Sequence, residues 1–193
     1  RSPYFRNDPP WMTWSCWHTD AAMDYMRTAI ALVRQEYPDL PYCFSFDGEN
    51  THFYRERDLS FFDLAEHHIW MTKLNKQQFY HEVGQAKDGR FTEEAYHLLA
   101  DHALDVYHNK EDYWKQLLVD GIQTLAADAK AAGLPLATTE CWGITDYKDF
   151  PMLPWDWVKD LCARGVETAC QTGQWALMAT SNFAAPQFCG MWR

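Results

Sequence analysis

Several features that would place this chain in a familiar class of proteins are missing from its 193 residues. No stretch approaches the roughly 18 uninterrupted apolar residues that a membrane-spanning helix requires. No glycine-rich loop of the G-x-G-x-x-G or G-x-x-x-x-G-K type is present, which excludes the usual nucleotide-binding motifs. The formal net charge is −10 and no basic patch is visible, which argues against a nucleic-acid partner. We therefore expect a soluble protein that binds neither membranes nor nucleic acids.

Cysteine and histidine patterns typical of metal sites are also missing. The six cysteines are scattered at positions 16, 43, 141, 162, 170 and 189, and no C-x-x-C pair occurs. Most of them lie in apolar runs, which is typical of reduced thiols in a core rather than of disulfides. There is no H-E-x-x-H motif, and His97 and His102 are five residues apart, a poor spacing for two ligands on one helix. We expect no metal and no cofactor, and the composition leaves the cellular compartment open.

Aromatic side chains, by contrast, are abundant. They make up 16% of the chain and include ten tryptophans. Flat rings with one polar edge suit a core, but they also suit sugars, whose C–H faces stack on them. Hydrophobic residues account for 47% and charged residues for 23%, an ordinary globular composition. We therefore treat residues 1–193 as a single domain.

Helical and strand-like segments alternate along the chain. Apolar residues at steps of three and four predict helices, and short apolar runs bounded by turn residues predict strands. The alternation is typical of parallel strands joined by right-handed crossovers, which is an α/β fold. The predicted helices span residues 21–36, 57–63, 92–107, 110–132 and 155–172, the predicted strands span 42–46, 64–71, 134–139 and 175–180, and residues 75–89 are predicted to form a loop.

Polar residues gather where the predicted strands end. They include Asp47, His68, Glu140 and Asn182. In a (β/α)8 barrel the active site draws on several strand ends at the carboxyl face, whereas an open sheet concentrates such residues at one switch point. The pattern favours a parallel TIM-type barrel. Because four strands cannot close a barrel, we interpret the chain as the C-terminal half and expect the missing N-terminal half as its partner.

Glu140 follows the third long predicted strand at the point where the chain stops being apolar. A carboxylate in this position can cap the next helix, pair with a surface cation, or point into the barrel mouth as a catalytic group. On the preceding strand, alternation puts Glu66, His68 and Trp70 on one face and His67 on the other. Only one of the two histidines can therefore serve a site at this face.

Three segments together resemble the cellulase-like (β/α)8 glycoside hydrolases, a clan of retaining enzymes with two glutamates on barrel strands four and seven. The stretch GLPLATTECWG at residues 133–143 resembles the strand-seven pattern, in which an apolar strand ends in the nucleophilic glutamate. The stretch EHHIW at residues 66–70 resembles the His-x-aromatic pattern of strand six. The closing run at residues 175–183 is similar to the eighth strand. We expect the barrel of this clan from that resemblance.

The resemblance also implies roles for individual residues. Glu140 falls on the nucleophile of retaining hydrolysis of a β-linked glycoside, and His68 falls beside it. The acid/base glutamate of the clan follows an asparagine on strand four, and this chain contains no Asn-Glu pair. We expect that glutamate upstream of the chain. The residues expected to bind the sugar are Trp17, Trp70, Trp142 and Asn182.

Two other functions stay open at this point. A carbohydrate-binding relative would use the same aromatic rings without hydrolysis, and binding would then survive the loss of Glu140. An unrelated metal-dependent barrel acting on sugars would carry its carboxylate and histidine ligands on the missing strands, and a chelator would inactivate it.

Overall fold

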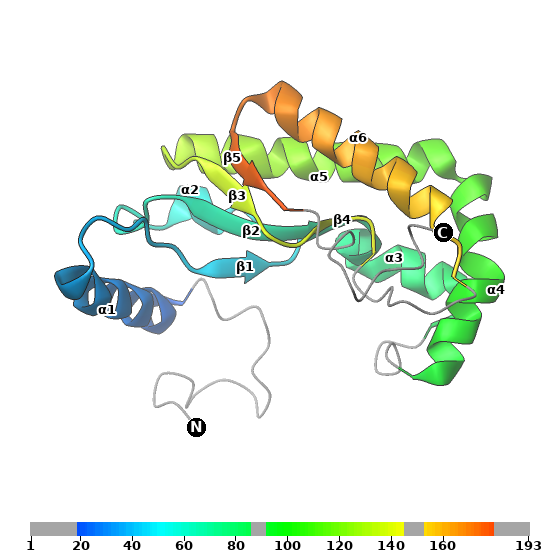
Figure 1. Ribbon diagram of the computed structural model, residues 1–193, viewed down its shortest axis with the longest axis horizontal. Helices are drawn as coiled ribbons and strands as arrows, with labels where there is room; N and C mark the ends of the chain where they lie inside the picture. Colours follow the sequence, from blue (N-terminus) through cyan, green and yellow to red (C-terminus); the bar gives the residue numbers. More distant parts are fainter. Residues whose placement is uncertain (1–18, 86–91, 145–152, 180–193) are drawn as a thin grey trace.

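A sheet of five parallel strands with helices packed on it forms the centre of the protein (Figure 1). The computed structural model describes residues 19–85, 92–144 and 153–179. The strands are β1 (Ser45–Asp47), β2 (Ala65–Trp70), β3 (Leu136–Thr138), β4 (Cys141–Trp142) and β5 (Trp175–Met178). The helices are α1 (Asp20–Glu36), α2 (Phe53–Glu56), the 3-10 turn η3 (Met71–Lys73), α3 (Leu74–Val83), α4 (Glu93–Asn109), α5 (Glu111–Ala131) and α6 (Asp156–Thr172).

Strands that follow one another in the chain lie next to one another in the sheet. The order is β1, β2, β3, β5, and β4 continues beyond β3 to pair with β2. All of these pairs are parallel, with Asp47 opposite His68 and Glu66 opposite Ala137. Among the described strands the order never reverses, as it would at the switch point of a doubly wound sheet. The predicted parallel α/β fold is therefore confirmed.

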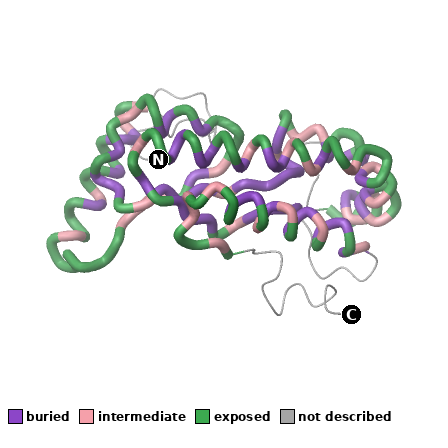
Figure 2. The backbone as a smooth tube through the Cα atoms, turned by 90° about the horizontal axis from the view of Figure 1, so that it is seen from above, coloured by how far each residue is buried: buried purple, intermediate pink, exposed green. Residues whose placement is uncertain are grey.

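Helices α5 and α6 run side by side along the sheet (Figure 1) and bury the largest aromatic side chains. The ring of Phe79 on α3 stacks on Trp157 of α6 at 5.0 Å between centroids and meets Trp114 of α5 edge-on at 5.3 Å. Figure 2 shows buried positions recurring along the helices between exposed ones, as expected for amphipathic helices on a core. In the described ranges, no helix has the length and apolarity needed to cross a membrane.

Capping residues set the helix ends. The hydroxyl of Thr19 accepts a hydrogen bond from the N–H of Ala22 at 3.3 Å and begins α1, and Thr92 accepts from Ala95 at 3.2 Å to begin α4. Helix α6 ends at Gly173, whose φ of 66° lies in the left-handed region that glycine adopts without steric cost. These local signals explain why the long helices agree closely with their predicted spans.

Two predictions for the shorter segments are wrong. The predicted helix at 57–63 is not formed, because its apolar residues Leu59, Phe61 and Phe62 pack into the core from a loop, and the helix lies earlier, at α2. The predicted loop at 75–89 is in part helix α3: Asn75, Lys76 and Gln77 have positive φ angles of 48°, 57° and 64°, and a regular helix follows them up to Val83. Its polar composition concealed a buried stripe formed by Phe79, Tyr80 and Val83.

The third long strand is also shorter than predicted, because it breaks at residues 139 and 140. β3 ends at Thr138 and β4 begins at Cys141. In the break, the N–H of Thr139 is bonded to the side chain of Glu66 instead of to a neighbouring strand. The period-two alternation of side chains therefore does not continue from β3 into β4.

We predict that Gly165→Ala destabilises the protein. A Cβ at residue 165 would lie 2.6 Å from Cγ of the buried Trp142 ring, so α6 or the ring must shift. We expect a loss of about 1–3 kcal/mol in the free energy of unfolding from such overpacking. Urea unfolding measures it.

Gly121→Ala in α5 is the matched control. Its Cβ would meet only the ends of Leu74 and Ile69, at 3.1 and 3.3 Å, which can rotate away. Both changes gain the same helix propensity. Equal stabilities of the two variants would contradict the packing of Trp142 against α6.

Candidate active site at the carboxyl ends of the strands

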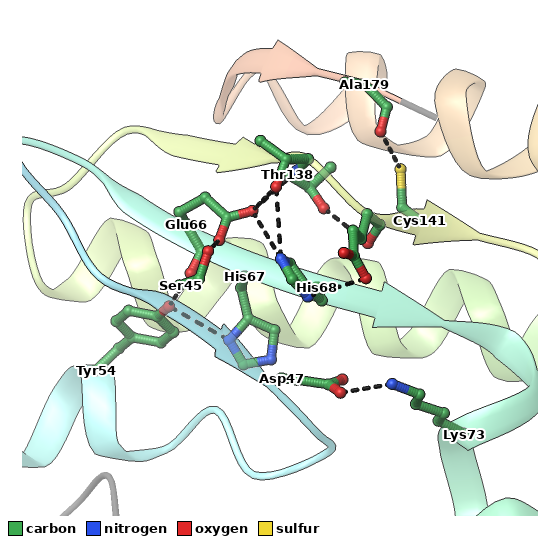
Figure 3. A network of polar contacts seen from close by, with 12 residues as sticks. Ser45, Asp47, Tyr54, Glu66, His67, His68, Lys73, Thr138, Cys141 and Ala179 are labelled. Carbon is green, nitrogen blue, oxygen red and sulfur yellow. Dashed lines mark hydrogen bonds and ion pairs between the residues drawn. The ribbon is translucent and has the colours of Figure 1, made fainter. Parts of the chain in front are cut away.

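Side chains from three adjacent strands meet on one face of the sheet near its carboxyl end (Figure 3). β1 contributes Ser45 and Asp47, β2 contributes Glu66 and His68, and the break between β3 and β4 contributes Glu140. The hydroxyl of Ser45 donates to Glu66, and His68 forms ion pairs with both glutamates. The parallel register brings these residues together. Ser45 lies opposite Glu66 and Asp47 opposite His68, and Glu140 follows β3, whose Ala137 lies opposite Glu66.

Glu66 is the most enclosed carboxylate of the group. The residue is 4% exposed, and both carboxylate oxygens accept hydrogen bonds. Ser45 donates to Oε2, while Oε1 accepts from the N–H of Thr139 at 2.9 Å and from its hydroxyl at 2.8 Å. The Nε2 atom of His68 lies 3.4 Å from the same Oε1. Burial alone would raise the pKa of Glu66, but the hydrogen bonds from His68, Ser45 and Thr139 lower that pKa to about 2.

His68 lies between two carboxylates. Its Nε2 faces Glu66, and its Nδ1 lies 3.4 Å from Oε2 of Glu140. Burial by itself lowers the pKa of an imidazole, but here Glu66 and, to a smaller extent, Glu140 raise the pKa of His68 above its ordinary value. The ring therefore keeps both protons over more of the neutral range and donates one toward each glutamate.

Glu140 differs from Glu66 in its exposure. Its side chain is 46% exposed, whereas that of Glu66 is 5% exposed. The backbone is held in place, because the carbonyl of Glu140 accepts from the N–H of Ile69 at 3.2 Å and from the hydroxyl of Thr138 at 3.3 Å. The carboxylate is therefore fixed at its base and open to a ligand at its tip.

A second ion pair borders this group. Asp47 is directly opposite His68 in the register, and its Oδ2 lies 2.5 Å from Nζ of Lys73, which follows β2 in η3. Both side chains are about one-fifth exposed. The charge of Asp47 is thus compensated locally, while its position keeps it next to the imidazole.

His67 lies on the opposite face of β2, as the alternation predicts. Its Nε2 donates to the carbonyl of Gly48 at 2.9 Å, and its Nδ1 accepts from the hydroxyl of Tyr54 on α2 at 3.3 Å. Burial lowers the pKa of His67, so this ring is neutral. A cavity of about 280 Å³ lined in part by His67 and Ile69 lies on this side, and Glu140 does not border it.

The two tryptophans expected to stack on a sugar are packed inside the protein. Trp70 is 3% exposed and Trp142 is fully buried. Because the strand breaks before β4, the ring of Trp142 packs on Gly165 of α6 rather than beside Glu140. Stacking requires an exposed ring face. We therefore assign both rings to the core.

Among the remaining expected site residues, His68 and Glu140 lie together, as the resemblance implied. Glu66 also contacts His68, although no role was expected for it. The alternation of side chains put Glu66 on the same face as His68, but its contacts with Ser45 and Thr139 depend on the register of three strands, which the sequence does not reveal.

Two expected sugar-binding residues, Trp17 and Asn182, lie outside the described residues. Among those described, no group of three or more histidine, cysteine or acidic side chains is placed to hold a metal ion.

We predict an acid-sensitive contribution of Glu66 to stability. The pKa of Glu66 in the folded protein, about 2, lies below its ordinary value of 4.5. The contribution is therefore complete above about pH 4.5 and is lost as the pH falls toward 2. It amounts to about 3 kcal/mol. Urea unfolding at pH 6 and pH 2.5 should show a smaller loss for Glu66→Gln than for the wild type.

Glu56→Gln is the control for this prediction, because it removes an exposed carboxylate of α2. It should keep the pH dependence of the wild type. If Glu66→Gln also keeps it, Glu66 is not held ionised by its neighbours.

Comparison with known proteins assigns the chain to one family. A family model for cellulase-like proteins, described as sugar-binding, matches residues 1–193. The crystal structure of a candidate glycoside hydrolase from Parabacteroides distasonis is similar, with 47% sequence identity and a TM-score of 0.88. The match covers 95% of this chain and 48% of that one, so this chain spans about half the length of that relative. Among curated proteins, no significant match is found. The chain belongs to the family of sugar-binding, cellulase-like proteins.

Proposed function

We propose that the chain forms the C-terminal half of a (β/α)8 barrel. The sequential order of its parallel strands supports this arrangement, since consecutive strands of a barrel are neighbours. Within the described part, β1 and β5 each pair with one neighbour, which leaves one edge of each strand open for further pairing. The structural relative, about twice as long, has room for the other half.

We further propose that the complete protein is a retaining glycoside hydrolase with Glu140 as its nucleophile. Family membership supports a function that involves carbohydrates. The observation that carries the proposal is the half-exposed Glu140 carboxylate, anchored through its backbone and paired with His68 at the carboxyl end of the sheet. Active sites of barrel enzymes lie at this end.

In the proposed reaction, a carboxylate oxygen of Glu140 attacks the anomeric carbon of a β-linked glycoside. A glutamate in the other half of the barrel protonates the departing oxygen, which takes the electrons of the broken bond. Water, deprotonated by the same glutamate, then releases the sugar from the glycosyl ester and regenerates the Glu140 carboxylate. Two carboxylates on opposite sides of the bond are sufficient for this chemistry.

His68 orients Glu140 in this proposal. An imidazolium within 3.4 Å stabilises the ionised carboxylate that has to attack. Trp17 and Asn182 stay proposed sugar-binding residues. Asp47 and Lys73, at the border of the same face, offer hydrogen-bond partners for sugar hydroxyls.

Sugar binding without hydrolysis is the second candidate function. The description of the family as sugar-binding favours it directly. It requires no acid/base glutamate in the other half, and Glu140→Gln should then bind the sugar as the wild type does. Family membership argues against an unrelated metal-dependent barrel, which we do not propose.

We predict that Glu140→Gln in the complete protein lowers kcat on an activated aryl β-glycoside by a factor on the order of 10⁴ or more, because the covalent step is lost. Glu140→Ala with added azide should regain turnover and release a glycosyl azide of inverted anomeric configuration. Product analysis by NMR spectroscopy identifies it.

Glu167→Gln, which changes an exposed carboxylate of α6, is the matched control and should keep the wild-type kcat. Near-normal turnover by Glu140→Gln would eliminate Glu140 as the nucleophile. A protein without hydrolysis that still binds sugar would favour the second candidate.

We also predict that another part of the complete protein covers the outer face of α1. Leu32 and Val33 of α1 are 60% and 48% exposed here, and Tyr37, directly after the helix, is 60% exposed, which is unusual for large apolar side chains so close together. In the complete protein, Leu32→Asp should lower the free energy of unfolding by at least about 2 kcal/mol, the cost of losing a buried leucine. Gln123→Asp, at an exposed polar position of α5, should have little effect. Equally small effects of both changes would contradict a covered face.

A further inference from the structure

We propose that Glu66 is a positioning residue that acts as the permanent counter-ion of His68, holding the imidazolium charged and oriented while Glu140 gains and loses its charge during catalysis. The inference rests on the proposed function of Glu140. It assigns different tasks to two glutamates that contact the two nitrogens of one ring.

The charged groups around His68 support this division. Three carboxylates of the described residues face the ring: Glu66 from β2, Glu140 from the break after β3, and Asp47 from β1. Asp47 is already paired with Lys73 at 2.5 Å, so its charge is largely compensated. His67, the nearest titratable neighbour in the chain, lies on the other face and is neutral because burial lowers its pKa. In the described part of the chain, only Glu66 and Glu140 therefore supply uncompensated negative charge to the ring.

The surroundings of Glu66 keep its carboxylate ionised and fixed in place. Its carboxylate is enclosed and accepts hydrogen bonds from Ser45 and Thr139 in addition to the contact with His68. A side chain that is 5% exposed does not contact a sugar. Its pKa of about 2 keeps it ionised over the whole range in which a glycosidase of this kind would work.

Glu140, in contrast, changes charge in the proposed reaction. When one of its oxygens bonds to the anomeric carbon, the carboxylate becomes a neutral ester and the leaving group departs with a proton from the acid glutamate. Among the described groups, Glu66 is then the uncompensated anion that remains beside His68. Without that anion, burial would favour loss of a proton from the ring. With it, the hydrolysed Glu140 returns to a ring that is still cationic.

The directions of the pKa shifts agree with this geometry. Burial alone would lower the pKa of His68, and the contact with Glu66 opposes burial more strongly than the charge of Glu140 does. Removing the charge of Glu66 should therefore affect the protonation of His68 more than removing the charge of Glu140.

The test is an NMR titration of His68 in the complete protein with isotope-labelled histidine, where His68→Gln identifies the signal. Glu66→Gln should shift the titration midpoint of His68 to lower pH, and by more than Glu140→Gln does. Glu56→Gln, an exposed change on α2, should leave the midpoint in place. In enzyme assays, Glu66→Gln should move the alkaline limb of the kcat profile to lower pH, which a purely structural defect would not do.

Two results would overturn the proposal. One is a larger shift of the midpoint in Glu140→Gln than in Glu66→Gln. The other requires no folded Glu66 variant: in Glu140→Gln, the midpoint of His68 must stay above the ordinary histidine value of about 6.5, and a midpoint at or below it would show that Glu66 is not a sufficient counter-ion. Neither readout uses substrate, so failure here is distinct from failure of Glu140 as the nucleophile, which appears as retained turnover.

Discussion

A buried carboxylate has to be satisfied by hydrogen bonds, and the candidate site depends on how Glu66 meets that requirement. Its oxygens accept hydrogen bonds from the hydroxyl of Ser45 on β1 and from the N–H and hydroxyl of Thr139 after β3. They also contact the ring of His68 on the same strand. Burying the charge unpaired would cost far more than the net stability of most domains allows. The same bonds that satisfy Glu66 therefore hold β1, β2 and the end of β3 together, and they engage the N–H of Thr139 where β3 stops.

The break in the strand gives the site its asymmetry. Because the chain leaves β3 at Thr139, Glu140 emerges with its backbone anchored and its carboxylate half exposed. Two glutamates consequently contact one imidazole from environments that differ in exposure. In many active sites, two titratable groups lie in different environments that push their pKa values apart, so that each group takes a different role as acid, base or nucleophile. Here we propose that the enclosed member holds the charge constant and the open member reacts.

Sequence patterns predicted the long elements well and the packing around the site less well. Helical periodicity and capping residues located α1, α4, α5 and α6, because those signals are local. The short helix α2 and the polar-looking α3 were missed, since their structure depends on the tertiary burial of Phe53 and Tyr54 in α2 and of Phe79 in α3. His68 and Glu140 were proposed as site residues from their places at predicted strand ends, and the two side chains do lie 3.4 Å apart. Glu66 was not, and Trp142 was misplaced, because both depend on register and on a strand break that alternation alone does not reveal.

The most direct test of the account is to trap the covalent intermediate in the complete protein. A 2-deoxy-2-fluoro β-glycoside with a good leaving group should form a stable glycosyl ester, because the fluorine slows its hydrolysis. Peptide mapping by mass spectrometry should then find the sugar on Glu140, and Glu140→Gln should prevent labelling. A label on Glu66 or on another carboxylate, or no label in a protein that hydrolyses the parent glycoside with retention, would contradict the assignment of Glu140 as the nucleophile.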